Sequence, residues 1–453
     1  MPVRSNFPED FTGPDAHLCA ESRIDAKVAV DLIREDHGPP FSLSIAADAV
    51  SDYLSDILGV RFARKLKTFQ YSFHLITKII LIFESRLNQS GFFMSGTLRS
   101  ASLRYVGLQQ DTSIYELQSS QFANKYFIIS GEGSRRLMAS PEVVGYDSYL
   151  SLLGETVDAL RFLFPSGGDV DIMTILRGGL NYPIEEACFR SGVRVRDMHF
   201  VSCERIIEDH VITGLDIKYE KLRITRGRTL VIGDIIATGD TLKMCMDEVV
   251  DRFRRKGGSI RKIIFFTIGG TRAIPLMERM TEQIGALFPG FEGFECFFYE
   301  GVFSVYRDKG VSGINVPDID FCWKDGLVLP EFRRYILDRP DALFEKCIIY
   351  DGGARRYEIP LHFREVLDYW EGILARADII DSFAMACEKL GYAGPLGYEP
   401  WLTETGFTEL PQKGLRELWE DEQALLRRSL GISLKELAER RINEISNVSK
   451  LYE

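Results

Sequence analysis

The sequence predicts an α/β protein whose central part is a parallel β-sheet with helices on both faces. A mixed N-terminal region precedes it, and a mainly helical C-terminal region follows. Between about 146 and 304, apolar runs of strand length alternate with amphipathic segments of helix length, a pattern typical of βαβ units. The chain has 453 residues, 45% of them hydrophobic, so two or three domains are expected.

The elements of the central part follow one another in a regular order. The expected strands cover 170–176, 198–203, 229–232, 262–268 and 294–299, and the expected helices cover 149–164, 183–190, 240–254 and 274–287. Pro165 ends the first of these helices, and Gly257 lies just beyond the end of the third, as helix-stopping residues do. We therefore expect a domain at 146–330.

The flanking regions differ from this pattern. Residues 1–145 mix helical spacing with a strand and a glycine-rich turn, and 331–453 contains mostly helical periodicity. The expected N-terminal elements are helices at 44–58 and 69–87, a strand at 125–130 and a turn at 131–134. The expected C-terminal helices cover 361–375, 379–390, 413–429 and 434–445. Neither flank suggests a chemistry of its own.

Composition excludes several classes of protein. The net charge of −11 disfavours nucleic-acid binding, which requires a basic surface. No apolar run approaches the ~20 residues of a membrane span, and the N-terminus lacks the apolar core of a signal peptide. The eight cysteines are scattered without metal-ligand spacing. We therefore expect a cytoplasmic protein with reduced cysteines.

The segment 230–242, Leu-Val-Ile-Gly-Asp-Ile-Ile-Ala-Thr-Gly-Asp-Thr-Leu, carries the clearest chemistry. An apolar strand brings Asp234 to its carboxyl end, and a tight loop then enters a helix. Backbone N–H groups at such a helix start bind anions, and Gly239 lets a phosphate approach closely. The hydroxyls of Thr238 and Thr241 add donors, while Asp234 can accept from sugar hydroxyls or bind a metal ion.

A second anion-binding loop is predicted upstream. The buried strand 170–176 ends in Arg177, Gly178 and Gly179. Two glycines free backbone N–H groups to face an anion, and the guanidinium supplies a bidentate charge. This arrangement alone is also typical of an ordinary turn with an exposed arginine.

Taken together, these segments resemble type I phosphoribosyltransferases. Residues 230–242 closely resemble the family's pattern for binding 5-phosphoribosyl 1-pyrophosphate (PRPP), and 175–180 is similar to the pyrophosphate loop of the uracil branch. The resemblance covers roughly 150–270. The chain departs from the pattern at Gly233, where the family usually has a first acid, and at Ala237, where the hypoxanthine-guanine branch has a carboxylate.

The resemblance implies a role for each loop. The 5-phosphate of PRPP would be bound by Ala237, Thr238, Gly239, Asp240 and Thr241. The pyrophosphate would be bound by Arg177, Gly178 and Gly179. Asp234 would contact the ribose and Mg²⁺, and Asp234, Arg177 and Lys221 would be the catalytic residues.

Two further segments allow alternative interpretations. Residues 204–221 resemble the flexible loop of the uracil branch, with Arg205, Lys218 and Lys221 as basic candidates, but they equally fit a solvated hairpin. Asp320, Phe321 and Trp323 are candidates for the acceptor pocket because they offer stacking and hydrogen-bonding groups. An ordinary surface loop explains that segment slightly better.

The sequence thus predicts a Mg²⁺- and PRPP-dependent transferase acting on a small-molecule nitrogen acceptor, with pyrophosphate released. A non-catalytic nucleotide sensor of the same fold is the alternative, favoured by the unmatched flanks and by Gly233. A larger biosynthetic protein with another activity in its flanks is a third hypothesis. The acceptor's identity and a homo-oligomeric state are left open.

Overall fold

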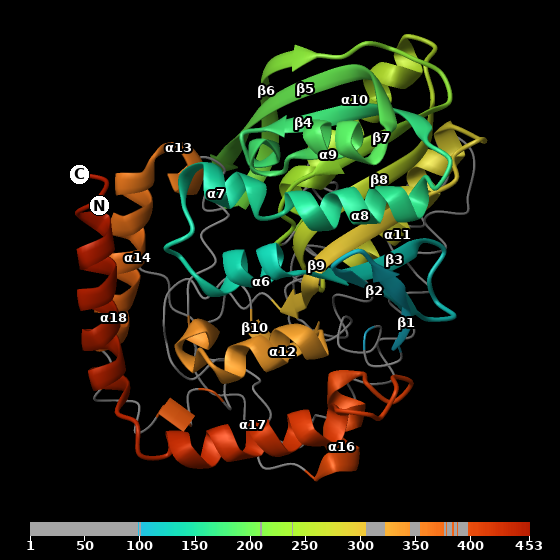
Figure 1. Ribbon diagram of the computed structural model, residues 1–453. Helices are drawn as coiled ribbons and strands as arrows, with labels where there is room; N and C mark the ends of the chain where they lie inside the picture. Colours follow the sequence, from blue (N-terminus) through green and yellow to red (C-terminus); the bar gives the residue numbers. More distant parts are fainter. Residues whose placement is uncertain are drawn as a thin grey trace, which may run out of the picture. The chain divides into compact units, whose positions relative to one another are not determined.

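The computed structural model describes residues 101–208, 211–237, 239–304, 322–344, 354–375 and 397–453, with single positions at 98, 377, 383, 384 and 387 (Figure 1). The helices predicted at 44–58 and 69–87 lie outside these residues, as does most of the one predicted at 379–390.

In the described part of the chain, ten strands form one sheet. They are β1 (Ser102–Gln109), β2 (Thr112–Gln118), β3 (Lys125–Ser130), β4 (Gly168–Leu176), β5 (Val193–Glu208), β6 (Val211–Lys221), β7 (Arg228–Gly233), β8 (Ile260–Gly270), β9 (Phe294–Ser304) and β10 (Cys322–Val328). Their order is β1-β2-β3-β9-β8-β7-β4-β5-β6, and β10 pairs with β9.

The sheet is mixed, which corrects the prediction of a purely parallel sheet. Six neighbouring strands, β3-β9-β8-β7-β4-β5, run parallel. Hairpins add antiparallel strands at both sides: β1 and β2 extend β3, and β5 continues past the end of β4 before β6 turns back along it. The strand predicted at 198–203 is therefore only the middle of β5, because the predicted loop after it is strand as well.

The predicted boundary near 146 does not separate two sheets. The strand predicted at 125–130 is β3, and it pairs with β9 of the central part. Strands from both sides of that boundary therefore share one sheet. The turn predicted at 131–134 instead leads into helix α6 (Glu132–Ala139). The division into three domains stays a prediction.

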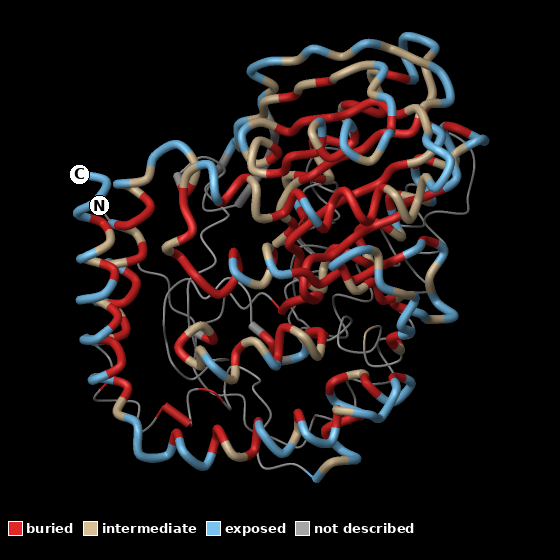
Figure 2. Tube along the Cα trace, in the orientation of Figure 1, coloured by how far each residue is buried: buried red, intermediate tan, exposed pale blue. Residues whose placement is uncertain are grey.

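Helices cover both faces of the sheet, as the alternating pattern predicts. α6, α8 (Leu153–Leu163) and α9 (Ile184–Ser191) pack on one face, and α10 (Asp240–Arg255) and α11 (Ala273–Leu287) on the other. Successive residues of β7 belong to opposite cores: Val231 packs on the first, and Leu230 and Ile232 on the second. The strands between these helices are correspondingly buried (Figure 2).

The C-terminal region is helical, as predicted. Its principal helices are α12 (Pro330–Leu337), α14 (Ile359–Leu374), α16 (Tyr398–Thr405), α17 (Leu415–Ser429) and α18 (Leu434–Ser449). α14 packs against α18 (Figure 1). A buried ion pair joins α12 to α17: Arg333 Nε donates to Glu422 Oε1 at 2.8 Å, and Trp401 Nε1 donates to Glu422 Oε2 at 2.9 Å. No helix in the described ranges has the length and apolar composition that crossing a bilayer requires.

Candidate functional site

Two loops leave neighbouring strands at the same edge of the sheet. β4 and β7 are parallel and paired, with Met173 opposite Ile232. β4 ends at Leu176 and β7 at Gly233, so Arg177 and Asp234 are the first residues beyond each strand. Open α/β sheets bind ligands at this carboxyl edge. The sequence predicts this juxtaposition, and the register of the strands produces it.

The backbone of the first loop lies directly on the second. Gly178 and Gly179 begin the 3₁₀ helix η2 (Gly178–Asn181). A β-carbon at position 178 would come within 2.3 Å of Asp234 Oδ1, and one at position 179 within 3.1 Å of the Gly233 carbonyl oxygen. A side chain at 178 would have to displace the Asp234 carboxylate, and one at 179 would press on the backbone, so both positions favour glycine. The Leu176–Arg177 peptide bond is cis. The approach of Gly178 and Gly179 places the first loop against the end of β7 and Asp234.

The second loop is fixed by backbone contacts with β8. Ile236 forms a parallel bridge with Gly269, and its carbonyl accepts from the N–H of Gly270 at 2.7 Å. Asp234 Oδ1 accepts from the N–H of Ile235 at 2.8 Å. These bonds hold the Asp234 carboxylate at the strand end, beside η2.

Gly239 starts helix α10 and is required there for two reasons. Its φ of +82° lies in the left-handed region, and a β-carbon would come within 2.3 Å of Leu276 Cδ2 on α11. Helix α10 has sixteen residues, so its N-terminus carries a partial positive charge. Of the other residues predicted to bind the phosphate, Ala237 and Thr241 are half-buried, Asp240 is exposed, and Thr238 lies outside the described residues.

The acid missing at Gly233 has a packing explanation. A β-carbon at 233 would come within 2.5 Å of Tyr182 Cβ. Tyr182 is buried, and its hydroxyl accepts from the N–H of Ile268 at 3.0 Å. The tyrosine therefore fills the space that a side chain at 233 would need, and the strand end carries the single acid Asp234.

Arg177 projects from the first loop with 64% of its side chain exposed. Its Nη1 lies 4.0 Å from Glu358 Oε1, and the Glu358 side chain is 46% exposed. Such exposed pairs contribute little to stability. The contact nevertheless brings a carboxylate from the C-terminal region to the guanidinium expected to bind pyrophosphate.

Strand β5 separates Lys221, on β6, from β4, the strand that leads to the first loop. Lys221 is exposed on the outermost strand, β6, where it lies opposite Phe200 in the register with β5. Its Nζ is 5.7 Å from the centre of the Phe200 ring. The predicted flexible loop is the β5–β6 hairpin. Its outer part extends past the end of β4, where Leu176 pairs with Ser202. Lys218 binds Glu204 and Asp216, and the side chain of Arg205 lies outside the described part.

Of the three predicted acceptor residues, Trp323 is the one that the described part of the chain includes. Trp323 is buried on β10, with its ring 5.7 Å from that of Phe332 and 5.0 Å from the Arg333 guanidinium. It is therefore a core residue. Asp320 and Phe321 lie outside the described residues.

Sequence reasoning missed several charged residues near this edge. Arg272 begins α11 two residues after Gly270, which bonds to the 234–239 loop. The run Gly269-Gly-Thr-Arg272 after a predicted strand was a usable signal, because it repeats the glycine–arginine composition of 177–179. Arg356 and Glu358 reach the first loop from about 180 residues away, and nothing local in the sequence indicates that.

A buried carboxyl group lies further along the same edge. Glu300 lies in β9, just beyond the residues that pair with β3. Its carboxylate accepts from Ser130 Oγ at 2.6 Å and from the N–H of Gly131 at 3.1 Å. Burial raises the pKa of Glu300 to about 8. Glu155, also buried, accepts from the N–H of Ser134 at 3.0 Å, and burial raises its pKa as well. These carboxyls accept hydrogen bonds from backbone N–H groups at the N-terminus of α6, which have no acceptor within the helix.

Comparison with known proteins gives structural likeness alone. No family model matches the chain, and no curated protein matches it in sequence. Among solved structures, a hypoxanthine phosphoribosyltransferase from Staphylococcus aureus matches at 15% identity and a TM-score of 0.23, over 28% of this chain and 66%, just under two thirds, of that one.

Two other solved structures show similar values. The AQ2163 protein from Aquifex aeolicus matches at 13% identity and a TM-score of 0.27, over 41% of this chain and 88% of that one. A purine phosphoribosyltransferase from Pyrococcus horikoshii Ot3 matches at 18% identity and a TM-score of 0.19, over 25% and 72%. All three TM-scores are below 0.5, so these likenesses do not show what this chain does.

Proposed function

We propose that the chain is a phosphoribosyltransferase that transfers the 5-phosphoribosyl group of PRPP to a nitrogen acceptor. The observation that carries the proposal is the contact between the two loops, with Gly178 against the Asp234 carboxylate. PRPP has a phosphate at one end and a pyrophosphate at the other, so its site requires two anion-binding loops on either side of a ribose contact. The 177–179 and 234–241 loops supply these parts next to each other.

Each group then has a defined role in the proposed reaction. The start of α10, with Gly239 and Thr241, binds the 5-phosphate. Asp234 accepts from the ribose hydroxyls, and Arg177 binds the pyrophosphate. The acceptor nitrogen forms a bond to C1 of the ribose while the bond from C1 to the pyrophosphate oxygen breaks, and that oxygen keeps the electron pair. Catalysis would come from positioning and from stabilising the leaving charge.

The residues at the loop junction fit a magnesium ion that is bound mainly by the phosphates of the substrate. Mg²⁺ is usually bound by one or two protein carboxylates together with substrate phosphates. Among the described residues there is no cluster of three or more metal-binding side chains, and Asp234 is the carboxylate at the loop junction. The ion would neutralise the pyrophosphate charge, and Asp234 would orient it.

Calorimetric titration tests the binding step. We expect the wild-type protein to bind PRPP in the presence of Mg²⁺, and to bind ribose 5-phosphate and pyrophosphate separately and more weakly. Pyrophosphate release with purine, pyrimidine and amine acceptors then tests transfer. A protein that binds none of the three ligands at millimolar concentration contradicts the proposal.

A nucleotide sensor of the same fold is the second candidate, and the Tyr182–Gly233 contact favours it. That contact leaves one acid where the family pattern usually has two, which removes a ribose contact without affecting the phosphate loop. Tight PRPP binding without pyrophosphate release from any acceptor would favour the sensor.

A further inference from the structure

Residues from the C-terminal region contact the loop proposed to bind pyrophosphate. Arg356 Nη1, in α13 (Ala354–Tyr357), donates to the carbonyl oxygen of Leu180. Glu358, the residue before α14, lies beside Arg177 at 4.0 Å. Leu180 is the third residue of η2, and its N–H donates to the Arg177 carbonyl at 3.1 Å. Arg356 therefore binds the same short turn that presents Arg177.

Arg356 is held in place on two sides. Its guanidinium lies 3.8 Å from the centre of the Tyr149 ring on α7 (Gly145–Leu150) and 4.7 Å from that of Tyr357. Arginine stacks on aromatic faces in this way while its N–H groups remain available as donors. Tyr149 is itself fixed, since its hydroxyl donates to Glu185 Oε1 at 3.1 Å. The guanidinium thus joins α7 to η2.

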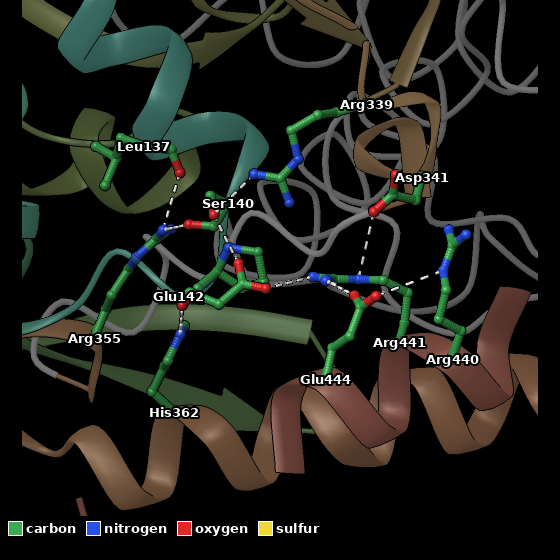
Figure 3. Close-up of polar contacts among 11 residues, drawn as sticks. Leu137, Ser140, Glu142, Arg339, Asp341, Arg355, His362, Arg440, Arg441 and Glu444 are labelled. Carbon is green, nitrogen blue, oxygen red and sulfur yellow. Dashed lines mark hydrogen bonds and ion pairs between the residues drawn. The ribbon is translucent and has the colours of Figure 1, made fainter. Parts of the chain in front are cut away.

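The backbone around Arg356 is anchored to the sheet-containing part of the chain. The neighbouring Arg355 is buried and donates to the carbonyls of Leu137, in the last turn of α6, and of Ser140 and Val143 after that helix. His362 Nε2 lies 2.7 Å from the carbonyl oxygen of Pro141. Figure 3 shows these side chains and Arg441 of α18 converging on the same segment. The C-terminal region therefore fixes where Arg356 and Glu358 lie.

We propose that Arg356 and Glu358 make the C-terminal region part of the pyrophosphate subsite. Arg356 is a positioning residue that shapes the 177–180 turn. Glu358 pairs with Arg177 until a more highly charged anion replaces it, so that pyrophosphate must compete with an internal carboxylate. This inference rests on the proposed function, because it assigns a ligand to Arg177.

The test compares pyrophosphate with ribose 5-phosphate by calorimetry in the presence of Mg²⁺. Glu358→Gln removes the competing charge and should tighten pyrophosphate binding about two- to fivefold, the range of an exposed ion pair, with a smaller gain at high salt. Arg356→Ala should weaken pyrophosphate binding about tenfold, the effect of one hydrogen bond to a loop carbonyl with its stacking contact. Neither should change ribose 5-phosphate binding.

Matched variants distinguish a role of Arg356 and Glu358 in the pyrophosphate subsite from a general effect of removing charge. Arg364→Ala and Glu371→Gln remove exposed charges from α14, and both should bind pyrophosphate like the wild type. Arg356→Lys keeps a charge and a donor for Leu180 but loses the planar stacking group, so it should restore part of the affinity. Melting temperatures identify variants that lose the fold, and Glu358→Gln, at a half-exposed position, keeps the test usable if Arg356→Ala unfolds.

The outcomes distinguish this inference from the function on which it rests. If wild-type protein binds pyrophosphate while Glu358→Gln and Arg356→Ala bind it equally well, the subsite assignment is wrong and the transferase proposal is unaffected. If Arg356→Ala lost affinity equally for pyrophosphate and for ribose 5-phosphate, the inference would also be overturned, because Arg356 would then stabilise the fold in general. If wild-type protein binds PRPP but not pyrophosphate, the subsite assignment fails alone, and if it binds neither of these nor ribose 5-phosphate, both proposals fail.

Discussion

The α-carbon of Gly178 lies so close to the Asp234 carboxylate that a β-carbon there would come within 2.3 Å of Asp234 Oδ1. Asp234 directly follows β7, and Gly178 is the second residue after β4. These two strands are paired. The relationship between the loops is therefore set by the sheet before any ligand arrives. A substitution at 178 should act on Asp234 and on the turn at once.

Gly178→Ala should disrupt ligand binding. The added methyl must displace the Asp234 carboxylate or the η2 backbone, an overpacking effect of about 1–3 kcal/mol. We expect PRPP and pyrophosphate affinities to fall about tenfold or more, measured by calorimetry with Mg²⁺. Gly154→Ala is the matched control: it adds the same methyl to α8, where nothing lies within 4 Å of the new carbon. Wild-type affinity in Gly178→Ala would remove the basis of the site.

The phosphate loop is tested more cleanly at Thr241 than at Gly239. Gly239→Val should abolish binding, but its branched side chain also meets Leu276 and opposes a φ of +82°, so we expect lower stability as well. Thr241→Val keeps the shape and removes the hydroxyl. Its affinity for ribose 5-phosphate should fall by about 1.5–3 kcal/mol, one hydrogen bond to a charged group, while Thr241→Ser should retain binding. Equal affinities in the two variants would exclude a hydroxyl–phosphate bond.

Glu300 should make stability depend on pH. Its pKa is raised to about 8 from 4.5, with burial as the main cause. A carboxyl whose pKa is higher in the folded state takes up protons on folding, so its contribution is complete below pH 4.5 and is lost as the pH rises through 8. The slope is at most about 1.4 kcal/mol per pH unit.

Urea denaturation at pH 5, 6, 7 and 8 measures that slope. Glu300→Gln keeps the shape without a titratable group, so its free energy of unfolding should fall less steeply than that of the wild type over this range. Glu282→Gln, at an exposed position on α11, should match the wild type. Parallel curves for wild type and Glu300→Gln would show that Glu300 does not titrate in this window.

Local sequence patterns predict the strands and helices of the central part well, because the residues of each element carry its signal. The predicted strand at 229–232 is β7 (Arg228–Gly233), and the predicted helix at 240–254 is α10 (Asp240–Arg255). Burial on both faces of a parallel strand produces a continuous apolar run, and Gly239 marks the helix start. The strand pattern also predicts that Arg177 and Asp234 lie at the same edge of the sheet, because parallel strands end at the same edge.

Other features depend on a long-range partner. The sequence of 204–221 fits a flexible loop and a hairpin equally, and the segment forms the hairpin because β5 continues beyond its neighbour β4. Trp323 has the composition of a stacking residue, but Arg333 and Phe332 enclose it. Glu358 meets Arg177 only through the fold of the C-terminal region. None of these partners can be inferred from local periodicity.

The last prediction distinguishes an enzyme from a sensor through Arg177 and Asp234. If the chain is a transferase, Arg177 contacts the pyrophosphate and stabilises its developing charge, whereas a nucleoside monophosphate has no pyrophosphate. Arg177→Ala should therefore lower the rate of pyrophosphate release and leave monophosphate affinity nearly unchanged, because only interactions stronger in the transition state accelerate the reaction. Asp234→Asn should weaken both, since it contacts the ribose of either ligand.

The measurement combines pyrophosphate release over a panel of acceptors with titrations of PRPP and monophosphates. Arg279→Ala, which removes an exposed arginine from α11, is the control and should behave like the wild type. A wild-type protein that binds PRPP but releases no pyrophosphate with any acceptor is a sensor, and Arg177→Ala would then change PRPP affinity alone. We expect the transferase result, because a sensor of the 5-phosphate would need only the 234–241 loop, whereas this chain also places Gly178 and Gly179, directly after Arg177, against that loop.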